Sequence, residues 1–196
     1  MMPLSLCLMV MMVVIVAPPA ATQVIFGGRC PVQNVVQNFN AAGYLGKWYE
    51  IEKYFTIFEV GGRCITATYY DLGTMIGVLN QQTSVFGNKV TSIQGQAQFV
   101  NPASREAKLS VTFGNSIFGM LSAGNNGNYW VLDTDYFNYA IVWACQDITF
   151  ANAQFLWILM RQQKPDPQLL YYVKTVIRQR GLDVSRLQVT DQTNCF

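Results

Sequence analysis

Two pairs of neighbouring carboxylates are the first groups in this sequence that could do chemistry. Glu50 and Glu52 are two residues apart, and so are Asp133 and Asp135. Such a pair can serve as general acid and general base when burial raises the pKa of one member. We expect neither pair to do so, because Glu50 and Glu52 fall on one outward face of a predicted strand, while Asp133 and Asp135 flank a turn.

The sequence contains no histidine, and this narrows the reactions open to it. Serine and cysteine triads, most catalytic zinc sites and the commonest general base all require an imidazole. The glycines at 124–128 alternate with asparagine, which is typical of a turn and not of a phosphate-binding loop. A net charge of +2 without a basic cluster does not favour nucleic acid as a partner. We therefore expect a protein that is not an enzyme.

The N-terminal segment indicates export. Residues 1–28 carry no charged side chain, and the apolar run over 4–17 ends at Pro18-Pro19. That run is too short to span a bilayer comfortably. Small residues follow at 20–22, so we predict a cleaved signal peptide over residues 1–22 and a secreted, extracellular protein of one domain over 23–196. An uncleaved anchor is the alternative.

Four cysteines remain after the predicted signal peptide has taken Cys7 with it, namely Cys30, Cys64, Cys145 and Cys195. Four cysteines allow three disulfide pairings, and their spacing does not choose among these. A zinc site would need a close Cys-x-x-Cys pair or histidine ligands, and the sequence offers neither. We expect disulfides and no metal.

Short runs rich in Val, Ile, Thr, Tyr and Phe are the predicted strands that position the carboxylates and cysteines. They alternate with Gly, Asn and Ser at intervals of about ten residues, which is typical of an all-β barrel or sandwich. A chain of 196 residues, 51% apolar and 12% charged, suits one globular domain. We predict eight strands, at 46–54, 63–71, 77–84, 89–99, 106–113, 129–133, 139–144 and 154–160.

One helix is predicted after the last strand. Apolar residues recur with helical spacing at 169, 170, 173, 176 and 177. Asp166 provides an N-cap, Pro167 suits the first helical position, and Gly181 marks the end. The apolar face of this helix should pack against the outside of the barrel.

Three short segments far apart in the chain share one explanation: Gly46-Lys47-Trp48, Thr134-Asp135-Tyr136, and Arg161 at the end of the last strand. If the first and last strands meet at one end of a closed barrel, the arginine lies over the tryptophan. This pattern resembles the lipocalins, and within them the branch of apolipoprotein D and its insect relatives. The resemblance covers about 28–195 and rests on Gly28-Arg29-Cys30-Pro31, on 44–53, on Gly62-Arg63-Cys64-Ile65 and on 189–195.

The resemblance implies an eight-stranded antiparallel up-and-down β-barrel with one C-terminal α-helix packed outside. It also implies the disulfides Cys30–Cys145 and Cys64–Cys195. Loops of this length would each contribute about 4 to 5 kcal/mol to stability on the chain-entropy model. The residues expected to close one end of the barrel are Gly46, Trp48, Thr134, Asp135, Tyr136 and Arg161.

An eight-stranded barrel has room inside for one small ligand, and alternate side chains of each strand point inward. The resemblance places Tyr69 and Trp157 in such a pocket. Strand alternation adds neighbours on the same faces, and we also include Phe118 of an open-end loop; the remaining predicted ligand-binding residues are Ile65, Ala67, Phe155 and Leu159. The alternative is that these side chains fill a solid core.

Apolar side chains recur in every loop predicted at the open end. A contiguous apolar patch often marks a contact with a membrane, a lipid particle or a protein. The alternative is that these side chains fold inward as a lid. The apolar side chains of these open-end loops are, loop by loop, Phe55, Ile57 and Phe58; Val85 and Phe86; Ile117, Phe118, Met120 and Leu121; and Ile148 and Phe150.

We therefore expect a secreted carrier of a small hydrophobic ligand. The resemblance suggests a lipid, a steroid or a biliverdin-like tetrapyrrole, with no required cofactor, and a monomer or weak homo-oligomer. One alternative is a dedicated pigment-binding protein. Others are a protein- or lipid-surface interaction module, or an enzyme like the lipocalin-type prostaglandin synthase, which would need a free cysteine nucleophile.

Overall fold

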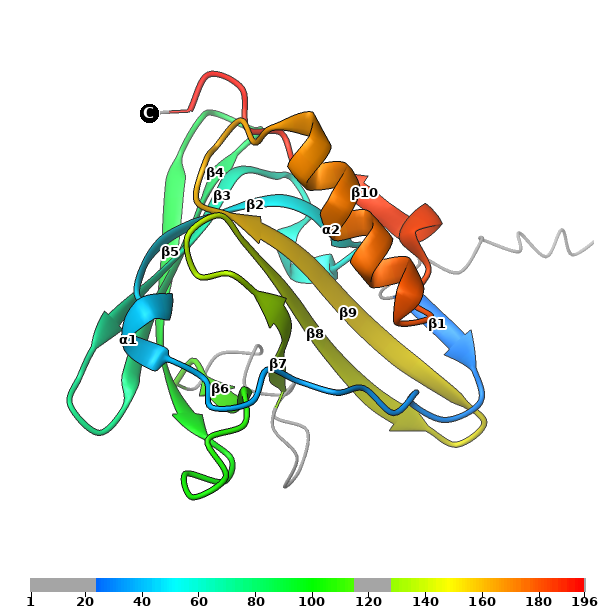
Figure 1. Cartoon of the computed structure of the whole chain (residues 1–196). Coiled ribbons are helices and arrows are strands. Elements are labelled where there is room, and N and C mark those ends of the chain that lie inside the picture. Colours follow the sequence, from blue (N-terminus) through cyan, green and yellow to red (C-terminus); the bar gives the residue numbers. More distant parts are fainter. Residues whose placement is uncertain (1–23, 115–127, 196) are drawn as a thin grey trace, which may run out of the picture.

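The protein folds into a closed β-barrel. A computed structural model describes residues 24–114 and 128–195; the predicted signal peptide lies outside them. Strands β2 to β9 each pair with the next along the chain in antiparallel fashion, and β9 pairs back with β2 (Figure 1). The predicted fold class is confirmed.

The elements are β1 (Val24–Gly27), α1 (Ala41–Tyr44), β2 (Gly46–Tyr54), the 3-10 turn η1 (Ile57–Glu59), β3 (Gly62–Asp71), β4 (Ile76–Ser84), β5 (Val90–Phe99), β6 (Lys108–Thr112), β7 (Tyr129–Thr134), β8 (Tyr139–Ile148), β9 (Ala151–Met160), α2 (Pro167–Gln179), the 3-10 turn η4 (Val184–Arg186) and β10 (Leu187–Val189).

The eight predicted strands correspond to β2–β9, with differences at their ends. The β8–β9 hairpin is longer than predicted, because Gln146 and Asp147 pair with Ala153 and Asn152 although their polar side chains interrupt the apolar pattern. The short elements β1, β10 and α1 were not predicted. β1 extends the sheet beside β9, and β10 extends it beside β2.

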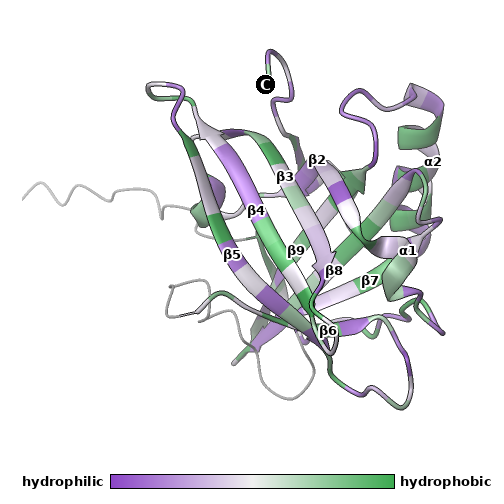
Figure 2. Cartoon of the chain, turned by 90° about the vertical axis from the view of Figure 1, so that its left-hand side faces the viewer, coloured by the Kyte–Doolittle hydropathy of each residue, from purple (hydrophilic) through white to green (hydrophobic). Residues whose placement is uncertain are grey.

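Helix α2 covers one side of the barrel, as predicted. Asp166 caps it by accepting a hydrogen bond from the Gln168 amide, and Val173 and Ile177 are buried beneath it. Figure 1 shows α2 along the outer side of β8 and β9, and both strands are buried over most of their length. In Figure 2 hydrophobic colouring covers much of these elements, whereas one half of β4 is hydrophilic and β5 alternates between hydrophobic and hydrophilic residues. Within the described ranges, no helix is long and apolar enough to cross a membrane.

The C-terminal tail completes the wall between β2 and β3. These strands pair only where Gly46–Tyr49 lies opposite Thr66–Tyr69. Beyond that point the Gln192 side-chain amide donates to the carbonyls of Glu50, at 2.9 Å, and Ile65, at 2.8 Å. The Cys64 amide donates to the Asp191 carbonyl at 2.8 Å. The tail therefore bridges two strands that no longer bond to each other.

Candidate functional site

The barrel contains a cavity of about 400 Å³. The resemblance predicted that Tyr69 and Trp157 face it, and strand alternation added their neighbours on β3 and β9; the structure places all six side chains on its wall. Phe118, which was predicted with them, lies outside the described residues. The six are Ile65, Ala67 and Tyr69 from β3, and Phe155, Trp157 and Leu159 from β9.

Aromatic rings form one side of the cavity. Phe155 and Trp157 stack with an angle of 10° between their planes and their centroids 5.8 Å apart. Phe58 stacks on Phe155 at 6.4 Å and also lines the cavity. Phe58 is one of the apolar side chains predicted at the open end, and it follows the alternative in which they fold inward. Phe58 lies in the 3-10 turn η1 between β2 and β3, where strand alternation does not fix the direction of a side chain.

Three tyrosine hydroxyls meet at the floor of the cavity. The Tyr129 hydroxyl lies 2.7 Å from that of Tyr69 and 2.8 Å from that of Tyr44. Burial raises the pKa of all three, so the hydroxyls stay neutral and keep their protons. Three hydroxyls joined by two hydrogen bonds leave one O–H donor unused. If Tyr44 donates to Tyr129 and Tyr129 donates to Tyr69, this donor belongs to Tyr69, which lines the cavity.

Asn80 supplies an acceptor on the opposite wall. It pairs with Ala67 of β3 and Ile93 of β5, which both line the cavity, so its side chain faces inward. Its Oδ1 is buried and has no hydrogen-bond partner among the described residues. A buried unpaired acceptor is unfavourable unless a ligand or water satisfies it. The same alternation rule, applied to β4, would have found Asn80 from the sequence.

Our prediction that Glu50 and Glu52 share one outward face is wrong. The pairing of β2 with β9 shifts register between these two residues, and such a bulge reverses the alternation of side chains. Glu50 therefore borders the cavity. Glu52 points to the outside, where Lys174 of α2 lies 2.6 Å from its carboxylate.

The closed end has the predicted arrangement of arginine over tryptophan. The Arg161 guanidinium lies 3.7 Å from the centre of the Trp48 ring. It donates to the carbonyls of Lys47 at 3.0 Å, Gly43 at 3.1 Å and Tyr136 at 3.1 Å. These bonds connect β2, α1 and the turn between β7 and β8.

Gly46 is needed at this end for two reasons. Its φ of +94° lies in the region that favours glycine. A Cβ at this position would also come within 3.2 Å of Nη1 of Arg161. The glycine of the Gly-Lys-Trp segment therefore leaves room for the arginine that covers the tryptophan.

Asp135 holds the neighbouring turn, as predicted. Its Oδ1 accepts hydrogen bonds from the amides of Phe137, Asn138 and Tyr139. Burial alone would raise the pKa of Asp135, but these bonds and the Asn138 side chain outweigh burial and lower it. Thr134 adds an acceptor for the Tyr136 amide at 2.9 Å. The carboxylate is structural here.

Both disulfides implied by the resemblance are present, Cys30–Cys145 and Cys64–Cys195. They use every cysteine in the described part of the chain, so none of these thiols is free to act as a nucleophile. The same residues contain no group of three or more His, Cys, Asp or Glu side chains that could hold a metal ion.

The barrel, its arginine-covered tryptophan and its internal cavity agree with a comparison of the whole sequence. A family model described as a lipocalin-like domain matches residues 39–192. The chain belongs to the lipocalin family. Members of this family bind small hydrophobic ligands and are generally binding or transport proteins rather than enzymes.

This lipocalin is similar to two curated proteins along most of its length. Over 170 residues it is 40% identical to apolipoprotein D of Oryctolagus cuniculus, covering 86% of this chain and 85% of that protein. Over 167 residues it is 34% identical to Lazarillo protein of Schistocerca americana, covering 84% and 75%. Among solved structures, insecticyanin of the tobacco hornworm Manduca sexta superposes with a TM-score of 0.73 at 25% identity, covering 86% of this chain and 89% of that chain.

Proposed function

We propose that this lipocalin is a secreted carrier of a small, mainly hydrophobic molecule with few polar groups. The observation that carries the proposal is the cavity of about 400 Å³ with aromatic walls. Small-molecule sites typically enclose about 300 to 1,000 Å³ and combine apolar walls with a few polar groups. Two disulfides and the predicted signal peptide support an extracellular location.

The polar groups of the cavity narrow the ligand class. The tyrosine floor offers one O–H donor, and Asn80 offers a buried acceptor. An elongated lipid or a steroid that carries one or two oxygen functions would satisfy both. A biliverdin-like tetrapyrrole is the second candidate, as the resemblance to insect lipocalins implies, and it would make the protein coloured.

Trp157→Ala tests whether the cavity binds the ligand. We expect its affinity for the extracted ligand to fall at least about tenfold, because the stacked indole provides a large apolar contact. Protein purified from culture medium would be extracted with organic solvent, the bound compound identified by mass spectrometry, and binding measured by calorimetry. A visible absorption band would indicate a tetrapyrrole.

Trp130→Ala is the matched control, because Trp130 lies in β7 but does not line the cavity. Equal affinities of the wild type and Trp157→Ala would contradict binding in the barrel. Recovery of no hydrophobic compound, together with failure to bind added lipids, steroids or biliverdin, would contradict the carrier function.

The carrier exchanges its ligand at a lipid surface through an open-end patch of exposed apolar side chains. The loops that carry them continue from strand ends that line the cavity, such as Gln82 of β4 and Gln146 of β8. The ligand itself partitions into lipid, so an apolar mouth suits that partner. Ile117, Met120 and Leu121, also predicted here, lie outside the described residues, and Phe55 is half-buried. The open-end patch is Ile57, Val85, Phe86, Ile148 and Phe150.

The double variant Phe86→Ser/Phe150→Ser tests this docking. The two side chains are 83% and 88% exposed, and burying each in lipid is worth about 1.5 to 3 kcal/mol. We expect the wild type to float with phosphatidylcholine vesicles and the variant to bind them at least about tenfold more weakly.

Phe137→Ser provides the control, because Phe137 is 82% exposed in the turn at the closed end. It should float like the wild type. Equal flotation of all three proteins would refute lipid docking. Loss of dimers in the double variant during sedimentation, without any flotation of the wild type, would assign the open-end patch to self-association instead.

A further inference from the structure

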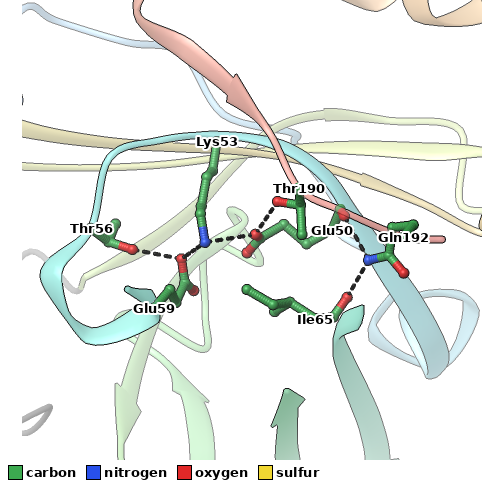
Figure 3. A network of polar contacts seen from close by, with 7 residues as sticks. All are labelled: Glu50, Lys53, Thr56, Glu59, Ile65, Thr190 and Gln192. Carbon is green, nitrogen blue, oxygen red and sulfur yellow. Dashed lines mark hydrogen bonds and ion pairs between the residues drawn. The ribbon is translucent and has the colours of Figure 1, made fainter. Parts of the chain in front are cut away.

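Glu50 places a carboxyl group on the cavity wall with one oxygen left unused. Its Oε1 accepts a hydrogen bond from the Thr190 hydroxyl at 2.5 Å and contacts the Lys53 ammonium at 3.0 Å (Figure 3). In the described part of the chain, no hydrogen bond or ion pair engages its Oε2. Because Glu50 borders the cavity, Oε2 is the oxygen that remains for a ligand.

Lys53 is shared between two carboxylates. Besides Glu50, its ammonium lies 2.6 Å from Oε2 of Glu59, which also accepts from the Thr56 hydroxyl (Figure 3). The side chains of Glu50, Lys53 and Glu59 are only 4%, 10% and 13% exposed. One ammonium cannot balance two buried negative charges, so one carboxyl group favours its protonated form.

Glu50 is the carboxyl that keeps the proton. It is the more buried of the two, and burial together with the charge of Glu59 raises the pKa of Glu50 to about 8. Burial lowers the pKa of Lys53, but Glu50 and Glu59 together outweigh burial and raise it, so the lysine stays charged. Since Oε1 already accepts two hydrogen bonds, the proton belongs on Oε2.

The other charged groups around Glu50 are engaged elsewhere. Glu52 and Lys174 pair on the outer face of the barrel. Arg63 of β3 donates to the carbonyls of Thr193 and Asn194 and to the Asn88 side chain. Asp191 of the tail accepts from the amide and hydroxyl of Thr193.

We propose that Glu50 selects ligands that carry a carbonyl or carboxylate oxygen, by donating a hydrogen bond to that oxygen from Oε2. The inference rests on the proposed carrier function and extends it, because it names the polar group that the ligand presents to this wall. A ligand without an acceptor leaves a buried O–H donor unpaired, which is unfavourable. Above the pKa of Glu50 the donor is lost, and the carboxylate repels the acceptor.

Two probes with chains of eleven carbons test the assignment: methyl nonyl ketone, which carries a carbonyl oxygen, and undecene, which carries no oxygen. Neither probe titrates, so any pH dependence comes from the protein. Binding would be followed by tryptophan fluorescence between about pH 6 and about pH 10. We expect the affinity for the ketone to fall about tenfold across this range, with a midpoint near pH 8, and the affinity for undecene to stay level.

Three variants separate the role of Glu50 from a general effect on the fold. Glu50→Gln keeps a neutral donor of similar size, so it should bind the ketone at all pH values without the fall. Glu50→Met has no donor and should bind the two probes alike. Glu52→Gln changes the outward-facing glutamate of the same strand and should retain the wild-type pH profile. Melting curves would accompany each titration.

Equal pH profiles for ketone and undecene in the wild type would overturn the assignment and leave the carrier function standing. So would a pH-dependent fall that persists in Glu50→Gln. If neither probe bound to the wild type and lipids and steroids also failed to bind, the carrier function and the role of Glu50 would fall together. Should Glu50→Met fail to fold, Glu50→Gln still decides the question.

Discussion

Replacing Cys64 and Cys195 together by serine will lower the free energy of unfolding by about 5 kcal/mol. The disulfide closes a loop of 131 residues, and the chain-entropy model gives a contribution of this size for so long a loop. The loss is a large fraction of the roughly 5 to 15 kcal/mol that stabilises a typical domain. Urea unfolding followed by circular dichroism would measure it.

The same double variant should also loosen the wall between β2 and β3. The tail that bridges these strands keeps its hydrogen bonds, such as Thr190 amide to Ile51 carbonyl at 2.9 Å, but loses its covalent anchor. We therefore expect faster hydrogen exchange at the Thr190 amide. Hydrogen exchange at this amide requires local opening, in which the tail detaches from β2.

Serine replacement of Cys30 and Cys145 is the matched control. That disulfide closes a loop of 115 residues, so the loss of stability should be similar, yet it lies away from the tail. Under conditions where both variants are folded, only the Cys64/Cys195 variant should show accelerated exchange at Thr190. Equal exchange in the two variants would contradict a special role of Cys64–Cys195 in anchoring the tail.

Arg161→Ala should destabilise the protein by about 3 kcal/mol without weakening ligand binding. The variant loses a cation–π contact worth about 0.5 to 2 kcal/mol and hydrogen bonds worth about 0.5 to 1.5 kcal/mol each. It also leaves the carbonyls of Lys47, Gly43 and Tyr136 without their donor. For a domain of this size the melting temperature should fall by about 6 to 12 °C.

Arg161→Lys separates the charge from the shape of the guanidinium. A lysine keeps the positive charge over Trp48 but lacks the planar fork that reaches several carbonyls at once, so its melting temperature should fall between those of the wild type and Arg161→Ala. Arg178→Ala, at an exposed site on α2, should melt like the wild type. Unchanged melting of Arg161→Ala combined with lost binding would move Arg161 from barrel closure to ligand recognition.

Local patterns accounted for an all-β fold with one helix, and the resemblance accounted for the barrel and part of its cavity. The resemblance placed Tyr69 and Trp157 on the inner wall, and period-two alternation added their neighbours, since successive side chains of a strand point to opposite faces. The spacing of Gly46, Trp48 and Arg161 indicated a closed end, and the structure has the arginine over the tryptophan. Asp166, Pro167 and Gly181 bounded the helix to within two residues.

Three features of the site escaped sequence reasoning. The bulge in β2 turned Glu50 toward the cavity and Glu52 away from it, although strict alternation puts them on one face. The inward position of Phe58 depends on the path of η1. The polar tail beyond β10 has no strand or helix periodicity, although it contributes to the resemblance, so nothing predicted that Gln192 bridges two strands through its side chain.

The sequence by itself determined the kind of fold, its closed end and much of the apolar wall. The all-β fold follows from hydrophobic periodicity and turn residues, and the closed end and the lining follow from short segments that resemble those of lipocalins. Only the tertiary structure decided the bridge from Gln192 to β2 and β3, the lysine shared between Glu50 and Glu59, and the unpaired oxygen of Glu50. Such features depend on contacts between residues that are far apart in the sequence. In addition, a single register shift in a strand reverses which of its side chains face the cavity.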